Sequence, residues 1–176
     1  MIEKEGKLGQ ILSLMPESDW EGLDLFLQSP YFNRSKPIRE LFECYRTAWL
    51  GKDSMPEDET LHRQIFPEHD FDPIRIKNLR AALQRKVDQF LSQSAFDCDS
   101  ILQANLHLKK LNLLGETRHF HRYLERARQD ARSISTDHAQ LELALFRLEE
   151  EQEAALAHSQ DRSKQVMDSS ESFEHA

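Results

Sequence analysis

The chain has 176 residues, of which 39% are hydrophobic and 31% are charged, and its formal net charge is −8. No run of apolar residues is longer than four, which excludes a hydrophobic segment able to span a bilayer. The β-branched residues (two Val, eight Ile and four Thr) are few beside 24 Leu, and this composition predicts an all-α protein.

Prolines and glycines divide the chain into two parts. All six prolines lie in the first 73 residues, whereas the rest contains no proline and one glycine, Gly115. We therefore expect short helices joined by loops over residues 1–95 and long antiparallel helices over residues 99–158. Together they form a predicted single all-α domain of six to eight helices, whose second part resembles a tetratricopeptide-like stack of helical hairpins. Residues 159–176 are polar and are expected to form a frayed or disordered tail.

Two amphipathic segments begin the chain. The apolar spacing predicts a first helix over residues 4–14. A second helix is predicted to start at a capping box, in which Ser18 accepts from the amide three residues on and Glu21 reaches back to Ser18. Ser29 and Pro30 end this helix. Its predicted buried positions are Trp20, Leu23, Phe26 and Leu27.

Aromatic residues are frequent in the next segment. Ser35 and Pro37 predict the start of a third helix, because proline is favoured at the first helical position. Its apolar residues recur at steps of three and four: Ile38, Leu41, Phe42, Tyr45 and Trp49. We assign the cluster of Tyr31, Phe32, Phe42, Tyr45 and Trp49 to the core. A groove for a partner helix would show the same pattern and is the alternative.

A short helix around Leu61 and Ile65 is predicted to end at Pro67. The longest predicted helix starts at Asp72 and Pro73, a cap acceptor followed by a proline, and runs to about Gln93. Its apolar stripe comprises Ile76, Leu79, Leu83, Val87, Phe90 and Leu91.

Three further helices are predicted after Asp99. The first carries apolar residues at 101, 102, 106, 108, 111, 113 and 114, too many for one face, so burial on two sides is expected. Gly115 is expected to end it in the left-handed conformation. In the last helix Leu141, Leu145 and Leu148 step by four and three. Packing of these leucines within the domain is preferred to self-association through a short coiled-coil seam.

Residues 26–33, Phe-Leu-Gln-Ser-Pro-Tyr-Phe-Asn, form an unusual string. It resembles a motif, FLxSPYFN, near the N-terminus of a group of uncharacterised bacterial proteins. A second element is similar to the same group and comprises Ile65-Phe66-Pro67, Phe71-Asp72, Leu79, Leu83 and Phe90-Leu91. The resemblance covers residues 20–95, and the relatives tend to be longer, with further helices. It implies a helical fold and no established activity, so it assigns no functional residue.

No enzyme is predicted, and no catalytic, cofactor-binding or metal-ligating residue. His119 and His121 point away from each other on a helix, and no two histidines have the spacing of three or four that metal ligands on a helix require. Cys44 and Cys98 have no recognisable histidine partner in the sequence, and five scattered glycines cannot form a phosphate-binding loop.

The charges are distributed unevenly. Residues 1–72 have a net charge of −7, residues 73–132 of +6, and residues 133–176 of −7. The basic centre can attract an anionic partner or pair with its acidic flanks, and internal pairing is the preferred interpretation.

One basic cluster is a candidate binding site. On the predicted helix 116–132, four arginines fall on the side away from Phe120 and Leu124: Arg118, Arg122, Arg126 and Arg132. We call them the arginine ridge. It could bind phosphates or an acidic protein surface, whereas a solvated face paired with the acidic last helix is the preferred alternative.

The leading functional hypothesis is a non-catalytic helical scaffold or protein–protein interaction module with an unknown protein partner. The alternative is an anion or nucleic-acid binder that uses the arginine ridge. Two lone cysteines without a Cys-x-x-Cys motif indicate a cytoplasmic protein. No membrane association is expected, and the expected oligomeric state is a monomer or a weak homodimer.

Overall fold

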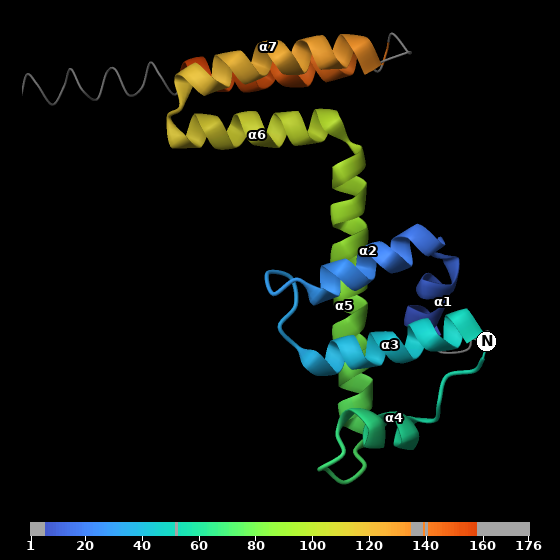
Figure 1. Ribbon diagram of the computed structural model, residues 1–176. Coiled ribbons are helices and arrows are strands. Elements are labelled where there is room, and N and C mark those ends of the chain that lie inside the picture. Colours follow the sequence, from blue (N-terminus) through green and yellow to red (C-terminus); the bar gives the residue numbers. More distant parts are fainter. Residues whose placement is uncertain (1–5, 52, 135–138, 140, 158–176) are drawn as a thin grey trace, which may run out of the picture. The chain divides into compact units, whose positions relative to one another are not determined.

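The computed structural model describes residues 6–51, 53–134, 139 and 141–157. Every regular element in this part of the chain is a helix, which confirms the predicted all-α fold (Figure 1). The helices are α1 (Gly6–Leu14), α2 (Glu17–Gln28), α3 (Lys36–Gly51), α4 (Asp58–Ile65), α5 (Pro73–Cys98), α6 (Ser100–Leu114) and α7 (Thr117–Ile134). Residues 141–157 are helical as well. The predicted tail, residues 159–176, lies outside the described residues.

The chain divides into two compact units, Met1–Ser94 and Ala95–Ala176, which we call unit 1 and unit 2. The boundary falls within α5, the longest helix, near its C-terminal end. The sequence predicted that α5 ends near Gln93, but the helix continues to Cys98. No proline or glycine interrupts residues 94–98, so the helix continues until Asp99 caps the next one.

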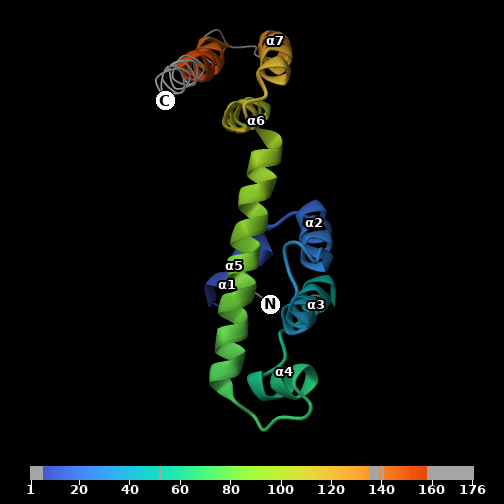
Figure 2. The ribbon, with the colours of Figure 1, turned by 90° about the vertical axis from the view of Figure 1, so that its left-hand side faces the viewer.

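Unit 1 packs α2, α3 and α4 along one side of α5 (Figure 2). Ile76, Leu79, Leu83 and Val87 of α5 are buried, as the predicted stripe requires. The last two residues of that stripe, Phe90 and Leu91, are half-buried and pack against the same core. They meet the apolar sides of the earlier helices because residues three and four apart share one helix face. All the positions predicted to be buried in α2 are buried: Trp20, Leu23, Phe26 and Leu27.

Two predictions for the first part of the chain are wrong. The capping box is absent: α2 begins at Glu17 after Pro16, no side chain caps it, and Ser18 lies inside the first turn. The carbonyl of Pro16 accepts from the amides of Asp19 and Trp20, so the proline sets the helix start. Tyr31 was assigned to the core, but its side chain is 87% exposed. The tight turn after Pro30 directs it outwards, edge-on to the ring of Phe32.

The end signals at Asp72 and Gly115 act as the sequence predicted, and Asp99 caps a further helix. The amide of Ile74 donates to Asp72 Oδ1 over 2.9 Å, which caps the start of α5. Asp99 Oδ1 accepts from the amide of Leu102 at the start of α6. Gly115 has φ 75° and ψ 15°, the left-handed conformation that ends α6.

Unit 2 is built on the hairpin of α6 and α7, with helix 141–157 packed against it (Figure 1). Its core contains Ala104, Leu108, Phe120, Leu124, Ala127 and Leu148. Leu148 packs within the unit, as predicted, whereas Leu141 and Leu145 are half-buried. The expected burial of α6 on two sides is wrong: Leu102, Leu106 and Leu113 are 37%, 48% and 70% exposed. Only the side of α6 that faces α7 finds apolar partners among the described helices.

Candidate functional site

A groove of about 390 Å³ lies between the first half of α2 and the last half of α3 in unit 1. Trp20 and Trp49 line its base, and we call it the tryptophan groove. Their rings stack with centroids 5.0 Å apart and an interplanar angle of 20°. Trp20 also stacks on Phe42, with centroids 5.7 Å apart. The base is therefore a rigid aromatic surface anchored in the core.

The two tryptophans differ in exposure. Trp20 is 2% exposed, whereas Trp49 is half-buried and covers it. The indole Nε1 of Trp20 is buried and has no hydrogen-bond acceptor among the described residues. A buried donor without an acceptor costs stability.

One wall of the groove is acidic. Glu17, Glu21 and Asp24 project from the same side of α2, because they are spaced by four and three residues. Asp24 is already engaged: its Oδ2 lies 2.8 Å from Arg46 Nη1, and its Oδ1 accepts from Gln28. Within the described parts of the chain, no basic side chain forms an ion pair with Glu17 or Glu21. Two carboxylates without an ion-pair partner among the described residues therefore line the groove.

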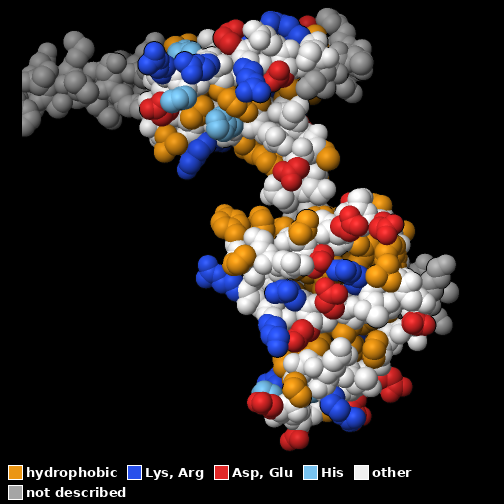
Figure 3. Space-filling model, viewed as in Figure 1, with side chains coloured by type: hydrophobic (Ala, Val, Ile, Leu, Met, Phe, Trp, Pro, Cys, Tyr) orange, Lys and Arg blue, Asp and Glu red, His pale blue; other side chains and the backbone are white. Residues whose placement is uncertain are grey.

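The rim of the groove is apolar. Leu25 of α2 is 70% exposed and Leu50 of α3 is 60% exposed, and both line the groove. Figure 3 shows hydrophobic side chains over α2 and α3 with acidic side chains beside them. Tryptophan is among the residues enriched at the centres of protein–protein interfaces.

The sequence anticipated this groove only in part. A groove for a partner helix was the alternative for the aromatic cluster that includes Trp49, but Trp20 and the acidic residues of α2 were not assigned to such a groove. Trp20 and Trp49 were both assigned to buried apolar stripes. Trp20 is buried as predicted, whereas Trp49 is only half-buried. Glu17 and Glu21, four residues apart beside a tryptophan, were the available signal.

The arginine ridge lies on α7 of unit 2. All four of its side chains, Arg118, Arg122, Arg126 and Arg132, are exposed on the side opposite the buried Phe120 and Leu124. Figure 3 shows basic side chains along this helix. The structure thus brings the predicted ridge residues onto one face.

The ridge has little internal neutralisation. Among the described residues, the ridge arginines make one ion pair, in which Arg126 Nε lies 3.8 Å from Asp130 Oδ2. Arg128, outside the ridge, pairs with Glu125 and donates to Gln152 of helix 141–157. The preferred interpretation, pairing of the ridge with the acidic last helix, is therefore not seen for these four arginines in the described part of the chain.

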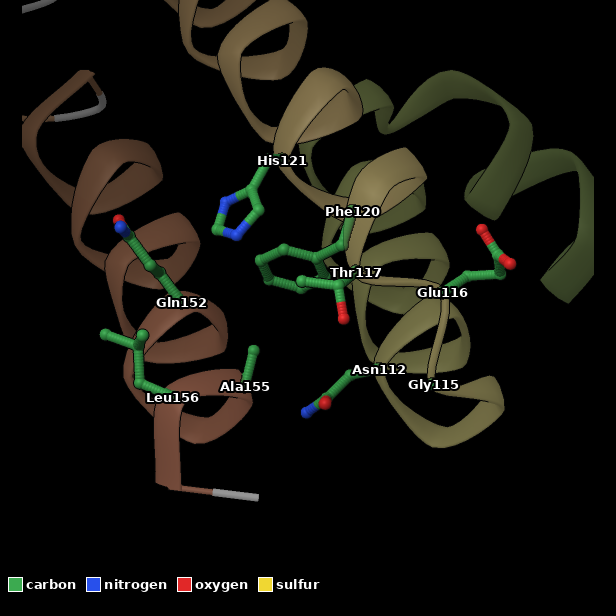
Figure 4. Close-up of a pocket in the computed structure, with 9 residues that line it drawn as sticks. All are labelled: Asn112, Gly115, Glu116, Thr117, Phe120, His121, Gln152, Ala155 and Leu156. Atoms are coloured by element: carbon green, nitrogen blue, oxygen red, sulfur yellow. The ribbon is translucent and has the colours of Figure 1, made fainter. Parts of the chain in front are cut away.

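A small cavity of about 40 Å³ lies between the turn of α6 and α7 and helix 141–157 (Figure 4). Phe120 forms its base, and Thr117 and His121 of α7 face Gln152 and Ala155 across it. Glu116 points away from the cavity. The volume admits one or two water molecules but no organic ligand.

The described residues contain no cluster of three or more His, Cys, Asp or Glu side chains arranged to hold a metal ion. His119, one of the two neighbouring histidines of α7, contacts Glu116, with Nδ1 2.7 Å from Oε2. No described helix is both long and apolar enough to cross a bilayer.

No protein-family model, curated protein or solved structure matches this chain.

Proposed function

We propose that this protein is a non-catalytic helical interaction module of the cytoplasm, and that the tryptophan groove binds a partner segment carrying basic and apolar side chains. The observation that carries the proposal is the stacked pair Trp20 and Trp49 beside two uncompensated carboxylates. A lysine or arginine of the partner can pair with Glu17 or Glu21 and lie over the ring of Trp49. Its apolar residues can pack between Leu25 and Leu50.

The typical binding free energies of such contacts indicate that a few residues of the partner are enough for recognition. A tryptophan in an interface centre commonly contributes about 2 kcal/mol or more when truncated to alanine. Each exposed ion pair adds about 0.2–1 kcal/mol. The groove therefore fits a short segment with one or two basic residues next to leucine or another large apolar residue.

The probe for the test is a synthetic amphipathic peptide of lysine and leucine, compared with the same peptide carrying glutamate for lysine. Trp20 and Trp49 are the two tryptophans of the chain, so intrinsic tryptophan fluorescence reports on the groove directly. We expect the lysine peptide to shift the emission in a saturable way and the glutamate peptide to leave it unchanged. Binding of both peptides with equal affinity would contradict the proposed recognition.

Charge reversal locates the binding site. We expect Glu17→Lys with Glu21→Lys to weaken binding about tenfold, since two ion pairs of about 0.7 kcal/mol each correspond to one decade in affinity. The matched control is Glu68→Lys with Asp70→Lys, which changes the net charge equally at exposed positions outside the groove. A control that weakens binding as strongly as the groove variant would show a nonspecific charge effect.

The second candidate function is anion or nucleic-acid binding by the arginine ridge. It is supported by four exposed arginines on one face, of which Arg126 has an acidic neighbour within ion-pair distance. The test is fluorescence anisotropy of a labelled single-stranded oligonucleotide. If all four arginines contact phosphates, the logarithm of the affinity should fall with the logarithm of salt concentration with a slope of about −3.

Replacing the four ridge arginines with glutamine should abolish that binding. The control replaces four exposed arginines of unit 1 instead: Arg34, Arg39, Arg63 and Arg85. Equal losses in the two variants would assign the binding to net charge and not to the ridge.

A further inference from the structure

α6 has a second apolar side, opposite the one that packs against α7. Leu102, Leu106 and Leu113 are spaced by four and seven residues, so they lie on one face, and all three are exposed. Lys109 falls between Leu106 and Leu113 on this face, and Lys110 lies beside it. We call these five residues the leucine–lysine face.

Helix 141–157 has a matching outer face. Its inner side packs into unit 2 through Ala144, Leu148 and Ala155. On the opposite side Leu143 is 51% and Phe146 is 56% exposed, and Glu150 and Glu153 continue the same face at steps of four and three. We call these four residues the leucine–glutamate face.

The two faces are complementary in kind. Each combines exposed large apolar residues with a predominant charge: lysine on α6, and glutamate on helix 141–157, where the exposed Arg147 lies at the edge of the face. α6 has 15 residues, and the described part of the other helix spans 17 residues. Neither face fits a second copy of itself, because two lysine faces or two glutamate faces would repel.

We infer that the leucine–lysine face of one copy binds the leucine–glutamate face of a second copy. Such a contact is heterologous, since different surfaces of the two copies meet, and a bound pair still has one free face of each kind. Association can therefore continue beyond a dimer, until a ring closes or a chain grows. This inference concerns unit 2 and does not depend on the tryptophan groove of unit 1.

The test is light scattering coupled to size exclusion on the full chain over a range of protein concentrations. We expect the mass to rise above the monomer value of 20.7 kDa with increasing concentration. Two charge-reversal variants should remain monomeric at every concentration: Lys109→Glu with Lys110→Glu, and Glu150→Lys with Glu153→Lys. All four positions are exposed, so both variants should retain the helix content of the wild type by circular dichroism.

An equimolar mixture of the two variants is the decisive sample. Each contact between the variants then again joins a lysine face to a glutamate face, so the mixture should recover the mass of the wild type. Lys77→Glu with Arg85→Glu on α5 changes the net charge as Lys109→Glu with Lys110→Glu does, and this control should associate like the wild type. A monomeric wild type, variants that still associate, or a mixture that stays monomeric would each overturn the inference.

Discussion

The side-chain amide of Asn33 donates a hydrogen bond to the backbone carbonyl of Leu27 over 3.0 Å. The same amide also donates to the carbonyl of Ser35, and its Oδ1 accepts from the amide of Ser35. Asn33 is buried, and its three bonds join the end of α2 to the start of α3. Asparagine suits this position because it carries both donors and an acceptor on one short side chain.

We expect Asn33→Ala to lower the free energy of unfolding of unit 1 by about 1–3 kcal/mol, because buried backbone groups lose their partners. Asn33→Asp should destabilise at least as much at neutral pH, since a carboxylate cannot donate to the carbonyl of Leu27. Urea unfolding followed by tryptophan fluorescence measures both, because Trp20 and Trp49 lie in unit 1.

Arg34→Ala is the control for this prediction. Arg34 Nε donates to the carbonyl of Pro30 on the surface of the same loop, so its loss should cost less than about 0.5 kcal/mol. If Arg34→Ala were as destabilising as Asn33→Ala, the hydrogen bonds of the buried Asn33 amide would not be the main stabilising contacts of the loop.

Gly22 marks a close approach of α2 to α5. A Cβ at this position would lie 3.0 Å from Cζ and 3.1 Å from Cε2 of the Phe90 ring. Alanine is more favourable than glycine inside a helix by about 1 kcal/mol. In Gly22→Ala this gain should be largely cancelled, because the Phe90 ring must shift and loosen its edge contact with Phe26.

A double-mutant cycle separates the two effects. In a Phe90→Leu background, where the ring is absent, Gly22→Ala should stabilise unit 1 by about 1 kcal/mol. Chemical unfolding of the four proteins measures the coupling. An equal effect of Gly22→Ala in both backgrounds would show that the Phe90 ring does not clash with the new Cβ.

Periodic elements were predictable from the sequence, and relations between elements were not. The stripe of α5 follows from spacing alone, and the end of α6 follows from the conformational freedom of one glycine. The role of Asn33 does not follow, because its partner Leu27 is six residues away across a turn of unknown shape. The tryptophan groove was anticipated only as an alternative to core packing of Trp49, because Trp49 fits a core stripe and only the packing of α3 on α2 shows that part of its side chain stays open.

Gly115 ends α6 with two backbone bonds. Its own amide donates to the carbonyl of Asn112, and the amide of Glu116 donates to the carbonyl of Leu111, both over 3.0 Å. Because φ is 75°, a Cβ at this position is strained. We expect Gly115→Ala to destabilise unit 2 by about 1–2 kcal/mol. Thermal unfolding followed by circular dichroism measures this change.

Gly115→Asn is the matched variant, because asparagine tolerates the left-handed conformation better than alanine does. It should cost clearly less than Gly115→Ala. Equal melting temperatures for the two variants would mean that the left-handed residue does not limit the stability of the hairpin.

The two cysteines differ in environment and should differ in reactivity. Cys44 is buried in α3 and Cys98 is exposed at the end of α5. Burial, and to a smaller degree the charges of Glu40 and Glu43, raise the pKa of the Cys44 thiol above its ordinary value of 9.0. Since the thiolate is the reactive form, iodoacetamide should modify Cys98 rapidly and Cys44 only after unit 1 opens. Mass spectrometry of the digested protein measures both rates.

The raised pKa also predicts a dependence of stability on pH. The folded state holds the Cys44 proton more tightly than the unfolded state does, so the contribution is complete below pH 9.0 and is lost as pH rises through the pKa of the folded protein. Cys44→Ala removes this titration, and its stability should therefore decline less steeply than that of the wild type above pH 9.0. Urea unfolding of both proteins from neutral to alkaline pH measures the difference. Parallel pH profiles, or a Cys44 that reacts as fast as Cys98 in the folded protein, would show that the thiol is not held in the neutral form by burial.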